Sequence, residues 1–141
     1  MRRAGRVRAL LDGAARTRVA AELAALRGGL PDCRTVLLCS VDGLVIASDS
    51  GVAEVDPAVL AAAATDLAAQ GRRTSPAVGV GDAVETVTRG AGGWIAVYPA
   101  GPFAVLAIVA GPGGNLALSS LGARRAAARL TEAVRLPDAR R

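Results

Sequence analysis

The sequence predicts an α+β domain in which a five-stranded, mainly antiparallel sheet carries helices on both faces. Three observations predict this class. The expected elements follow in the order helix, strand, strand, helix, three strands, helix. An Asp-Gly pair joins the first two strands, and short Gly- and Pro-rich turns join the last three, as in an antiparallel meander. The length of 141 residues is that of a single domain.

A first helix is expected over residues 16–28, where Val19, Leu23 and Leu26 recur at the spacing of one helical face. The Gly-Gly pair that begins at Gly28 ends this pattern, because glycine is typical of the end of a helix.

The chain divides into three parts. Residues 1–15 form a basic arm that we expect to be flexible, residues 16–135 form the domain, and residues 136–141 form a short tail. The arm carries a short apolar stripe that could lie on a membrane surface or on a partner, although a frayed helical tail is the simpler explanation.

The stretch RTVLLCSVDGLVIASDS, residues 34–50, predicts two strands joined by Asp42 and Gly43. Asp-Gly favours a type I′ hairpin turn, whose two central residues both need a positive φ. Asp42 is therefore interpreted as a turn residue and not as a catalytic carboxylate. Both faces of the first strand are apolar, which predicts that both are covered.

A second helix is expected over residues 57–71, with Asp56 as N-cap, Pro57 in the first turn and Gly71 as the stop. This helix is apolar nearly all round, which is typical of a helix buried on more than one side. One side is expected to lie on the sheet. The other is expected to meet a second helix, with that of a symmetry mate as one candidate. One apolar stripe of this helix consists of Leu60, Ala63, Ala64 and Leu67.

A loop over 72–81 and three strands over 82–89, 94–98 and 103–110 complete the sheet. A last helix is expected over 116–135, capped by Asn115. Its inward candidates are Leu118, Leu121, Ala128 and Leu130.

Composition favours a binding module. The chain is 52% hydrophobic even without its 17 Gly, against the ~45–50% of ordinary domains counted with Gly. This surplus of apolar residues suggests a partner surface. No apolar run reaches the ~18 residues of a membrane span. Cys33 and Cys39 lie too far apart on one strand for a disulfide, which predicts reduced thiols and a cytoplasmic location.

The residue types that are missing exclude many activities. The net charge is +5 and every basic residue is Arg, because Lys and His are absent. A Ser-His-Asp triad, a His-containing zinc site, a P-loop lysine and a Schiff base are thereby excluded. Phe, Trp and Tyr occur once each, so there is no aromatic platform for nucleic acid. We expect no catalysis, no metal, no cofactor and no nucleic-acid partner.

Several motifs follow one another along the chain. They are S-V-D-G-L-V-I-A-S at 40–48 with the Ala-rich helix after it, W-I-A-V-Y-P at 94–99, F-A-V-L-A-I-V-A at 103–110 and N-L-A-L at 115–118. Together they resemble the roadblock / dynein light chain family. The similarity covers residues 16–135. It implies strand order 2-1-5-4-3, with one helix on one face and two on the other. It also implies homodimers, or pairs with related chains, that join third strands edge to edge and pack second helices together.

The resemblance further implies a function. Prokaryotic members of the family act on small Ras-like GTPases as activators or adaptors and are not GTPases themselves. We therefore expect a homodimeric, non-catalytic regulator or adaptor of such a GTPase in a bacterial signalling system. Membrane association would be only indirect, or through the N-terminal arm. The expected dimer interface comprises Leu60, Ala64, Leu67, Val84, Thr86 and Thr88.

Arg72 and Arg73 could contact the GTPase, as an arginine finger reaches a phosphate, although ordinary surface arginines would look the same. Two alternatives stay open. A small-ligand-sensing α+β module would need a concave pocket, and an enzyme of an unusual kind would need turnover by the purified chain alone.

Overall fold

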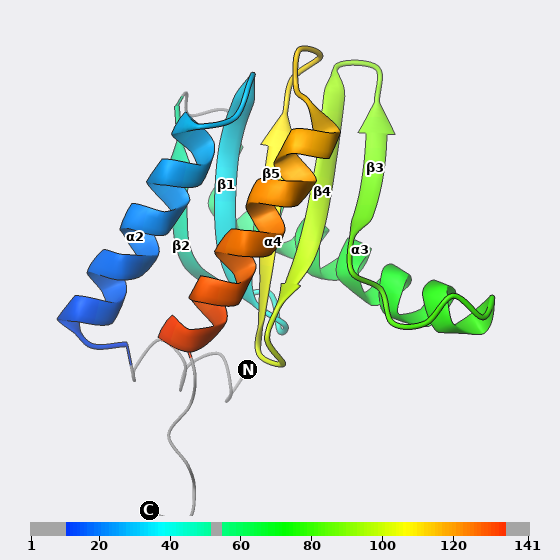
Figure 1. The fold of residues 1–141 in the computed structure, drawn as a ribbon, viewed down its shortest axis with the longest axis horizontal. Coiled ribbons are helices and arrows are strands. Elements are labelled where there is room, and N and C mark those ends of the chain that lie inside the picture. The colour runs from blue at the N-terminus through cyan, green and yellow to red at the C-terminus, as the bar shows by residue number, and fades with distance from the viewer. Residues whose placement is uncertain (1–10, 52–54, 135–141) are drawn as a thin grey trace, which may run out of the picture.

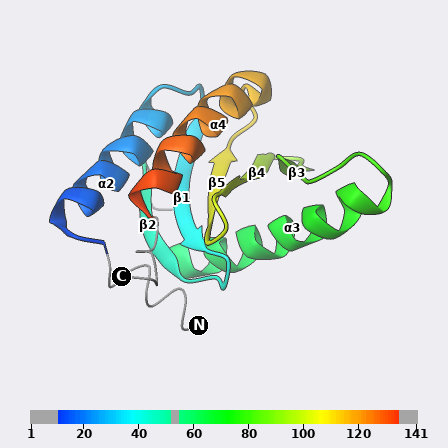
Figure 2. The same cartoon turned by 60° about the horizontal axis from the view of Figure 1, so that its bottom comes forward.

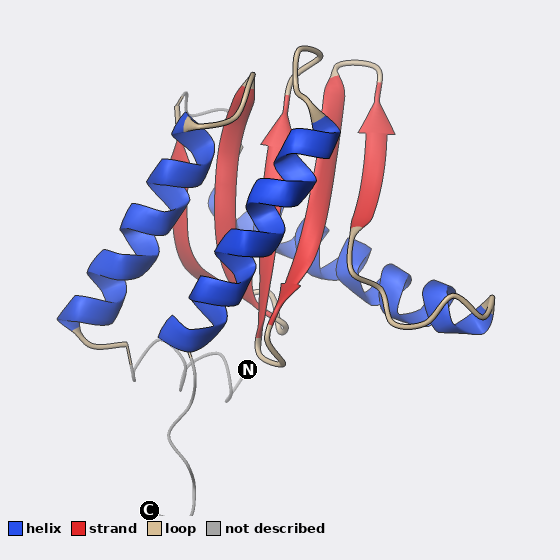
Figure 3. Cartoon of the chain, viewed as in Figure 1, coloured by secondary structure: helices blue, strands red, loops and turns tan. Residues whose placement is uncertain are grey.

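The computed structural model describes residues 11–51 and 55–134 of the chain (Figure 1). One five-stranded sheet runs in the order β2-β1-β5-β4-β3, and every neighbouring pair is antiparallel, which confirms the predicted class and order. Helices α2 and α4 cover one face, and α3 alone covers the other (Figures 1 and 2). The elements, coloured by type in Figure 3, are α2 (Gly13–Gly28), β1 (Cys33–Ser40), β2 (Val45–Ser50), α3 (Pro57–Ala77), β3 (Thr86–Gly90), β4 (Gly93–Ala100), β5 (Ala104–Ala110) and α4 (Leu116–Ala133).

The β1–β2 hairpin forms where predicted, with a different turn. The Gly43 amide donates to the Ser40 carbonyl at 3.0 Å, and the Ser40 amide donates to the Leu44 carbonyl at 2.9 Å. Within this turn only Gly43 has a positive φ, of 90°. The predicted type I′ turn is therefore wrong. The geometry is that of a three-residue loop in which a glycine with positive φ follows a tight turn.

Two apolar layers hold the domain together. The layer under α2 and α4 contains Val36, Leu38, Tyr98, Leu106 and Ile108 from the strands, with Val19, Leu23, Leu26 and Leu130 from the helices. The layer under α3 contains Leu37, Cys39, Val97, Val105 and Ala107, with Leu60, Ala61 and Ala64 from the helix. Successive β1 residues thus point to opposite layers. The prediction that both faces of this strand are covered is confirmed.

The first helix starts earlier than predicted. Asp12 caps it by accepting a hydrogen bond from the Ala15 amide at 2.7 Å, so α2 begins at Gly13 and not at residue 16. Leu11, before the cap, is buried in the α2–α4 layer. The sequence-based boundary failed because Gly13, Ala14 and Ala15 carry no periodic apolar signal.

The last helix forms nearly as predicted, but on a different stripe. Asn115 caps α4 by accepting from the Leu118 amide at 3.0 Å. Leu130 is buried as expected, whereas Leu118, Leu121 and Ala128 are exposed, which corrects the prediction. Small residues lie against the sheet and α2 instead. Their short side chains allow α4 to pack close to both. They are Ser119, Ala123, Ala126 and Ala127.

The second helix is longer than predicted. Helix α3 continues through Gly71 to Ala77, so residues 72–77 are helical and not loop. Gly71 is buried beside β3, and the helix ends at a left-handed glycine. Gly79 has a φ of 80°, and the amides of Gly79 and Val80 donate back to the carbonyls of Pro76 and Ser75. Strand β3 accordingly begins at Thr86 and not at residue 82. Among the described residues, no helix is both long enough and apolar enough to cross a bilayer.

Candidate interaction surface

The surface around β3 and α3 is the candidate functional site. Strand β3 is last in the sheet and pairs with β4 on one side only, so no described strand pairs with its outer edge. Helix α3 crosses beneath the sheet and extends past β3 (Figures 1 and 2). An unpaired strand edge beside a lone helix is open to pairing with another chain.

The structure places two of the three predicted interface residues of α3 inside the subunit. Leu60 and Ala64 are buried against the sheet, and Leu67 is partly buried against the same apolar layer. The second apolar side of the helix, expected from the sequence, consists of other residues. Val59 is 61% exposed, and Ala62 and Ala63 beside it are exposed as well. A helix contact with a second chain would use this outer face.

The predicted strand residues lie on and before β3. Thr86 is partly buried over α3, Thr88 is exposed, and both share the sheet face that α3 covers, opposite Val97 and Ile95 of β4. Val84 is exposed and precedes the strand. Sequence reasoning missed two further exposed valines in the same connection, Val78 and Val80. The alternation of valine and glycine over residues 78–81 was the available signal.

The connection between α3 and β3 has a defined shape. The Ser75 hydroxyl donates to the Gly81 carbonyl at 2.7 Å, which ties the end of the helix to the loop. Gly79 and Gly81 have positive φ angles of 80° and 85°, which glycine adopts readily. The exposed valines are therefore carried on a constrained loop.

Arg72 and Arg73 are both exposed on the last turns of α3, and neither forms an ion pair with a described residue. Arg72 lines a cavity of about 310 Å³ between α3, the start of β3 and the β4–β5 turn, and Arg73 does not. The cavity lining is mostly apolar and includes Val41, Ala68, Val97 and Val105.

Two residues that line this cavity, Glu85 and Tyr98, are joined by a partly buried hydrogen bond. The Tyr98 hydroxyl donates to Glu85 Oε1 at 2.7 Å, from β4 to the segment before β3. Burial, followed by this bond to Glu85, raises the pKa of Tyr98. The phenol therefore stays protonated at neutral pH and acts as a donor, positioning Glu85 rather than transferring a proton.

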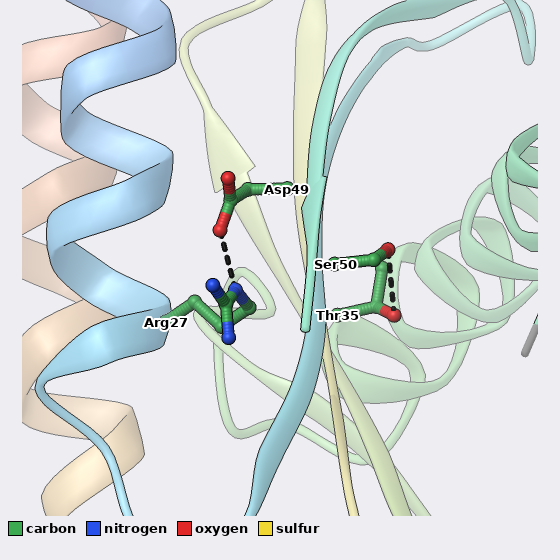
Figure 4. A network of polar contacts seen from close by, with 4 residues as sticks. All are labelled: Arg27, Thr35, Asp49 and Ser50. Carbon is green, nitrogen blue, oxygen red and sulfur yellow. Dashed lines mark hydrogen bonds and ion pairs between the residues drawn. The ribbon is translucent and has the colours of Figure 1, made fainter. Parts of the chain in front are cut away.

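The polar contacts at the opposite edge of the sheet are structural. Arg27 of α2 pairs with Asp49 of β2, and the hydroxyls of Thr35 and Ser50 lie 3.1 Å apart (Figure 4). The two pairs point to opposite faces of the β1–β2 hairpin, so they fix this edge to the helix on one side and to its neighbouring strand on the other. Asp49 is paired with Arg27 and the two hydroxyls contact each other, so these four side chains satisfy one another.

The two cysteines offer no reactive thiolate. Both are free, and burial raises the pKa of Cys33 to about 11 and that of Cys39 to about 12. At neutral pH both are protonated, and the thiol form is a poor nucleophile and a poor metal ligand. The described residues also contain no group of three or more Cys, Asp or Glu side chains that could hold a metal ion.

Comparisons with known proteins agree with this architecture. A family model described as Roadblock/LC7 domain matches residues 19–110. A structure titled "MglB with tetrameric arrangement" is 24% identical, with TM-score 0.78, and the match covers 88% of this chain and 93% of that one. The gliding protein mglB from Thermus thermophilus is also 24% identical, with TM-score 0.77 and the same coverage.

A Roadblock/LC7 domain from Streptomyces avermitilis is 25% identical, with TM-score 0.67, and the match covers 81% of this chain and 92% of that domain. A search of curated protein sequences finds no match. The structural likenesses span nearly the whole of each neighbour, so the chain has their complete fold.

Proposed function

This chain belongs to the Roadblock/LC7 domain family, and from that membership we propose that it is a homodimeric, non-catalytic regulator or adaptor of a small Ras-like GTPase in a bacterial signalling system, located in the cytoplasm. The bacterial sources of its structural neighbours support the setting. A neighbour whose title describes a tetrameric arrangement of MglB supports self-association as a property of this fold.

The observation that carries the proposal is the placement of an open strand edge beside an uncovered apolar helix face. The outer edge of β3 has no described partner strand, and Val59, Ala62 and Ala63 line the outer side of α3. A twofold axis next to β3 would pair two such edges into one continuous sheet and bring the two α3 helices together. Both features would then be buried by one symmetric contact.

Alanines on this face suit a close helix contact. A small side chain lets the backbone of a second helix approach, and the methyl groups together with Val59 would be removed from water. The exposed valines of the α3–β3 connection lie next to the strand that would pair, and would extend the apolar contact.

The chain's own chemistry supports a regulatory role. It contains no imidazole and no side-chain amine, and its two thiols are protonated. The positively charged side chains of α3 are both arginines. Arg72 and Arg73 carry full positive charge beside the proposed dimer axis, where they could contact an acidic loop or the nucleotide phosphates of the GTPase.

The test has two parts. Light scattering on the full chain should give the mass of a dimer at micromolar concentration. Affinity purification from the native cell should then recover a small GTPase, whose nucleotide hydrolysis rate or localisation should depend on this chain. A monomer, or a GTPase whose hydrolysis and localisation are both indifferent to the chain, would remove the proposal.

A second candidate function is supported by the cavity beside Arg72. Its volume of about 310 Å³ reaches the lower end of small-ligand sites, and its mostly apolar lining also includes Arg72, Glu85 and Tyr98. If the chain is a small-ligand sensor, its ligand would bind in this cavity. Mass spectrometry of the native protein should then show a co-purifying molecule that is lost in Val105→Trp, which fills the cavity.

A further inference from the structure

Leu118 and Leu121 are exposed on the face of the domain opposite α3. They are 44% and 51% exposed, and they lie three residues apart, so they project from the same side of α4. The core that α4 forms does not use them, because its buried residues are Ser119, Ala123, Ala126, Ala127 and Leu130. The proposed dimer contact does not use them either, because it lies on the other face of the sheet (Figure 2).

These leucines form one wall of a groove between two helices. Helices α2 and α4 run antiparallel, so the end of α2 lies beside the start of α4 (Figure 1). The groove between them has a volume of about 360 Å³, and Leu26 and Leu30 form the wall opposite Leu118 and Leu121. Two of its lining residues, Gly29 and Gly122, have no side chain, which leaves the groove wider at these positions.

The groove is basic at its rim. Its lining contains Arg125, Arg129 and a single carboxylate, that of Glu22. Arg129 Nε donates to Glu22 Oε1 at 2.8 Å, which neutralises this carboxylate and bridges the two helices. Arg125 is exposed and forms no ion pair with a described residue. The apolar floor is therefore bordered by an uncompensated positive charge.

Charge selects the occupant. The chain's own N-terminal arm carries Arg2, Arg3, Arg6 and Arg8, so it would bring positive charge to a positive rim. A second copy joined groove to groove would place Arg125 of each copy on the shared contact, where like charges repel. A helix with leucine-type side chains on one face and carboxylates beside them matches both the apolar floor and the rim.

We propose that the groove between α2 and α4 binds an acidic amphipathic helix of a partner protein. The partner's apolar side chains would lie between Leu26, Leu30, Leu118 and Leu121, and a flanking Asp or Glu would pair with Arg125. One such groove is present on each copy of the chain, and its use depends on neither the dimer contact nor the GTPase. The domain would thus join a second protein to whatever α3 and β3 bind.

The experiment uses the full chain and designed, fluorescein-labelled peptides of roughly five helical turns. The first peptide has Leu on one face and Glu beside the stripe. The second has Lys in place of each Glu, and the third has the composition of the first in an order without a stripe. Anisotropy should show the acidic striped peptide binding at least roughly tenfold more tightly than the other two. The difference between the two striped peptides should narrow as salt is raised.

Variants locate the binding site. Leu121→Ser and Arg125→Glu should each weaken the acidic peptide at least roughly fivefold, and Arg125→Glu should also improve the Lys peptide. Both residues are exposed, so the fold should persist, which circular dichroism checks. Val55→Ser is the matched control, because it removes an exposed apolar side chain that does not line the groove, and it should leave peptide binding unchanged.

Other results would overturn the proposal. Equal binding of all three peptides, or no effect of either groove variant, would show that the groove does not select an acidic helix. Leu121→Ser could instead lower the oligomeric mass, shift the amide resonances of Val7 and Leu10, or abolish binding to anionic vesicles. Those outcomes would identify a second copy, the chain's own arm or a membrane as the occupant.

Discussion

Gly71 of α3 lies directly beneath Thr86 of β3, so closely that a β-carbon on Gly71 would overlap the Thr86 hydroxyl oxygen. The β-carbon added to Gly71 would also lie 3.3 Å from Thr86 Cβ and 3.4 Å from Ala83 Cβ. The missing side chain at this position lets the helix reach the edge strand. The contact fixes α3 relative to the surface through which we propose that the chain pairs.

Gly71→Ala should therefore destabilise the domain although alanine is the better helix former. The helix propensity of Ala should contribute about 1 kcal/mol in favour, and the overlap should cost about 1–3 kcal/mol. We expect a net loss of roughly 1 kcal/mol in the free energy of unfolding, measured with urea. In a Thr86→Ala background the loss should shrink, because the overlapping oxygen is gone.

Gly28→Ala is the control for this prediction. Gly28 is also helical, and a β-carbon there would meet nothing within 4 Å. This substitution should be neutral or stabilising. If Gly71→Ala behaved in the same way, the proximity of α3 to Thr86 would have no energetic consequence.

Gly71 also shows where sequence reasoning succeeded and where it failed. The class and the caps Asp56 and Asn115 agree with the structure, because apolar periodicity and local chemistry carry them. The strand order also agrees, but only the family resemblance implied it. A glycine at a helix end and a glycine at a close helix–strand contact look alike in sequence. Only the position of Thr86, fifteen residues further along the chain, distinguishes them.

The candidate site was predictable in its elements but not in its residues. In an Ala-rich helix the apolar stripe is ambiguous, since Ala62 and Ala64 are the same residue type with opposite exposures. The sheet selects Leu60 and Ala64 for burial and leaves Ala62 outside. Likewise Leu118 and Leu121 were expected in the core, but small residues occupy the close contact and leave these leucines in the groove.

Ala62→Arg should convert the proposed dimer to a monomer. Ala62 lies on the outer face of α3, and a large charged side chain there would hold two helices apart and meet its own copy across a twofold axis. Light scattering at a fixed micromolar concentration should show the mass halved. Ala128→Arg, at an exposed alanine of α4 on the opposite face, should remain dimeric. Two variants with the same dimeric mass would place the interface elsewhere.

Arg73→Ala should weaken the action of this chain on its GTPase without affecting the dimer. Arg73 is exposed and forms no ion pair with a described residue, so its removal should not unfold the helix. Loss of a charged contact to the partner should lower the affinity by roughly tenfold. Titration of the co-purified GTPase would measure it, with Arg18→Ala on α2 as the control. A loss as large in Arg18→Ala as in Arg73→Ala would point to a general effect of charge.

Tyr98→Phe should cost about 0.5–1.5 kcal/mol of folding stability, the usual contribution of one hydrogen bond. The ring would keep its place in the core, while the hydroxyl would lose its 2.7 Å bond to Glu85 and its weaker interaction with Ser120. Urea unfolding measures the loss. Glu85→Gln in the same background should add little further, because the bond that Glu85 accepts from Tyr98 is already gone. Independent, additive losses would show that the two side chains do not act as a pair.

The free energy of unfolding should fall as the pH rises above about 8.5, the ordinary pKa of a thiol in an unfolded chain. Burial raises the pKa of Cys39 to about 12, so in this range the folded state keeps a proton that the unfolded state has lost. Stability is therefore complete below pH 8.5 and decreases toward the folded pKa, by up to about 1.4 kcal/mol per pH unit. Cys33 and Tyr98 contribute with the same sign.

The composition of the chain isolates this effect. With no His and no Lys, few groups other than the thiols and the tyrosine titrate between neutral pH and pH 10. Urea unfolding under reducing conditions and at fixed protein concentration should show a plateau near neutral pH and then a decline. Cys39→Ala should start lower, because it leaves a small cavity, and should lose roughly 1–2 kcal/mol less between pH 8 and pH 10. Parallel curves for the two proteins would mean that Cys39 can ionise within the folded core.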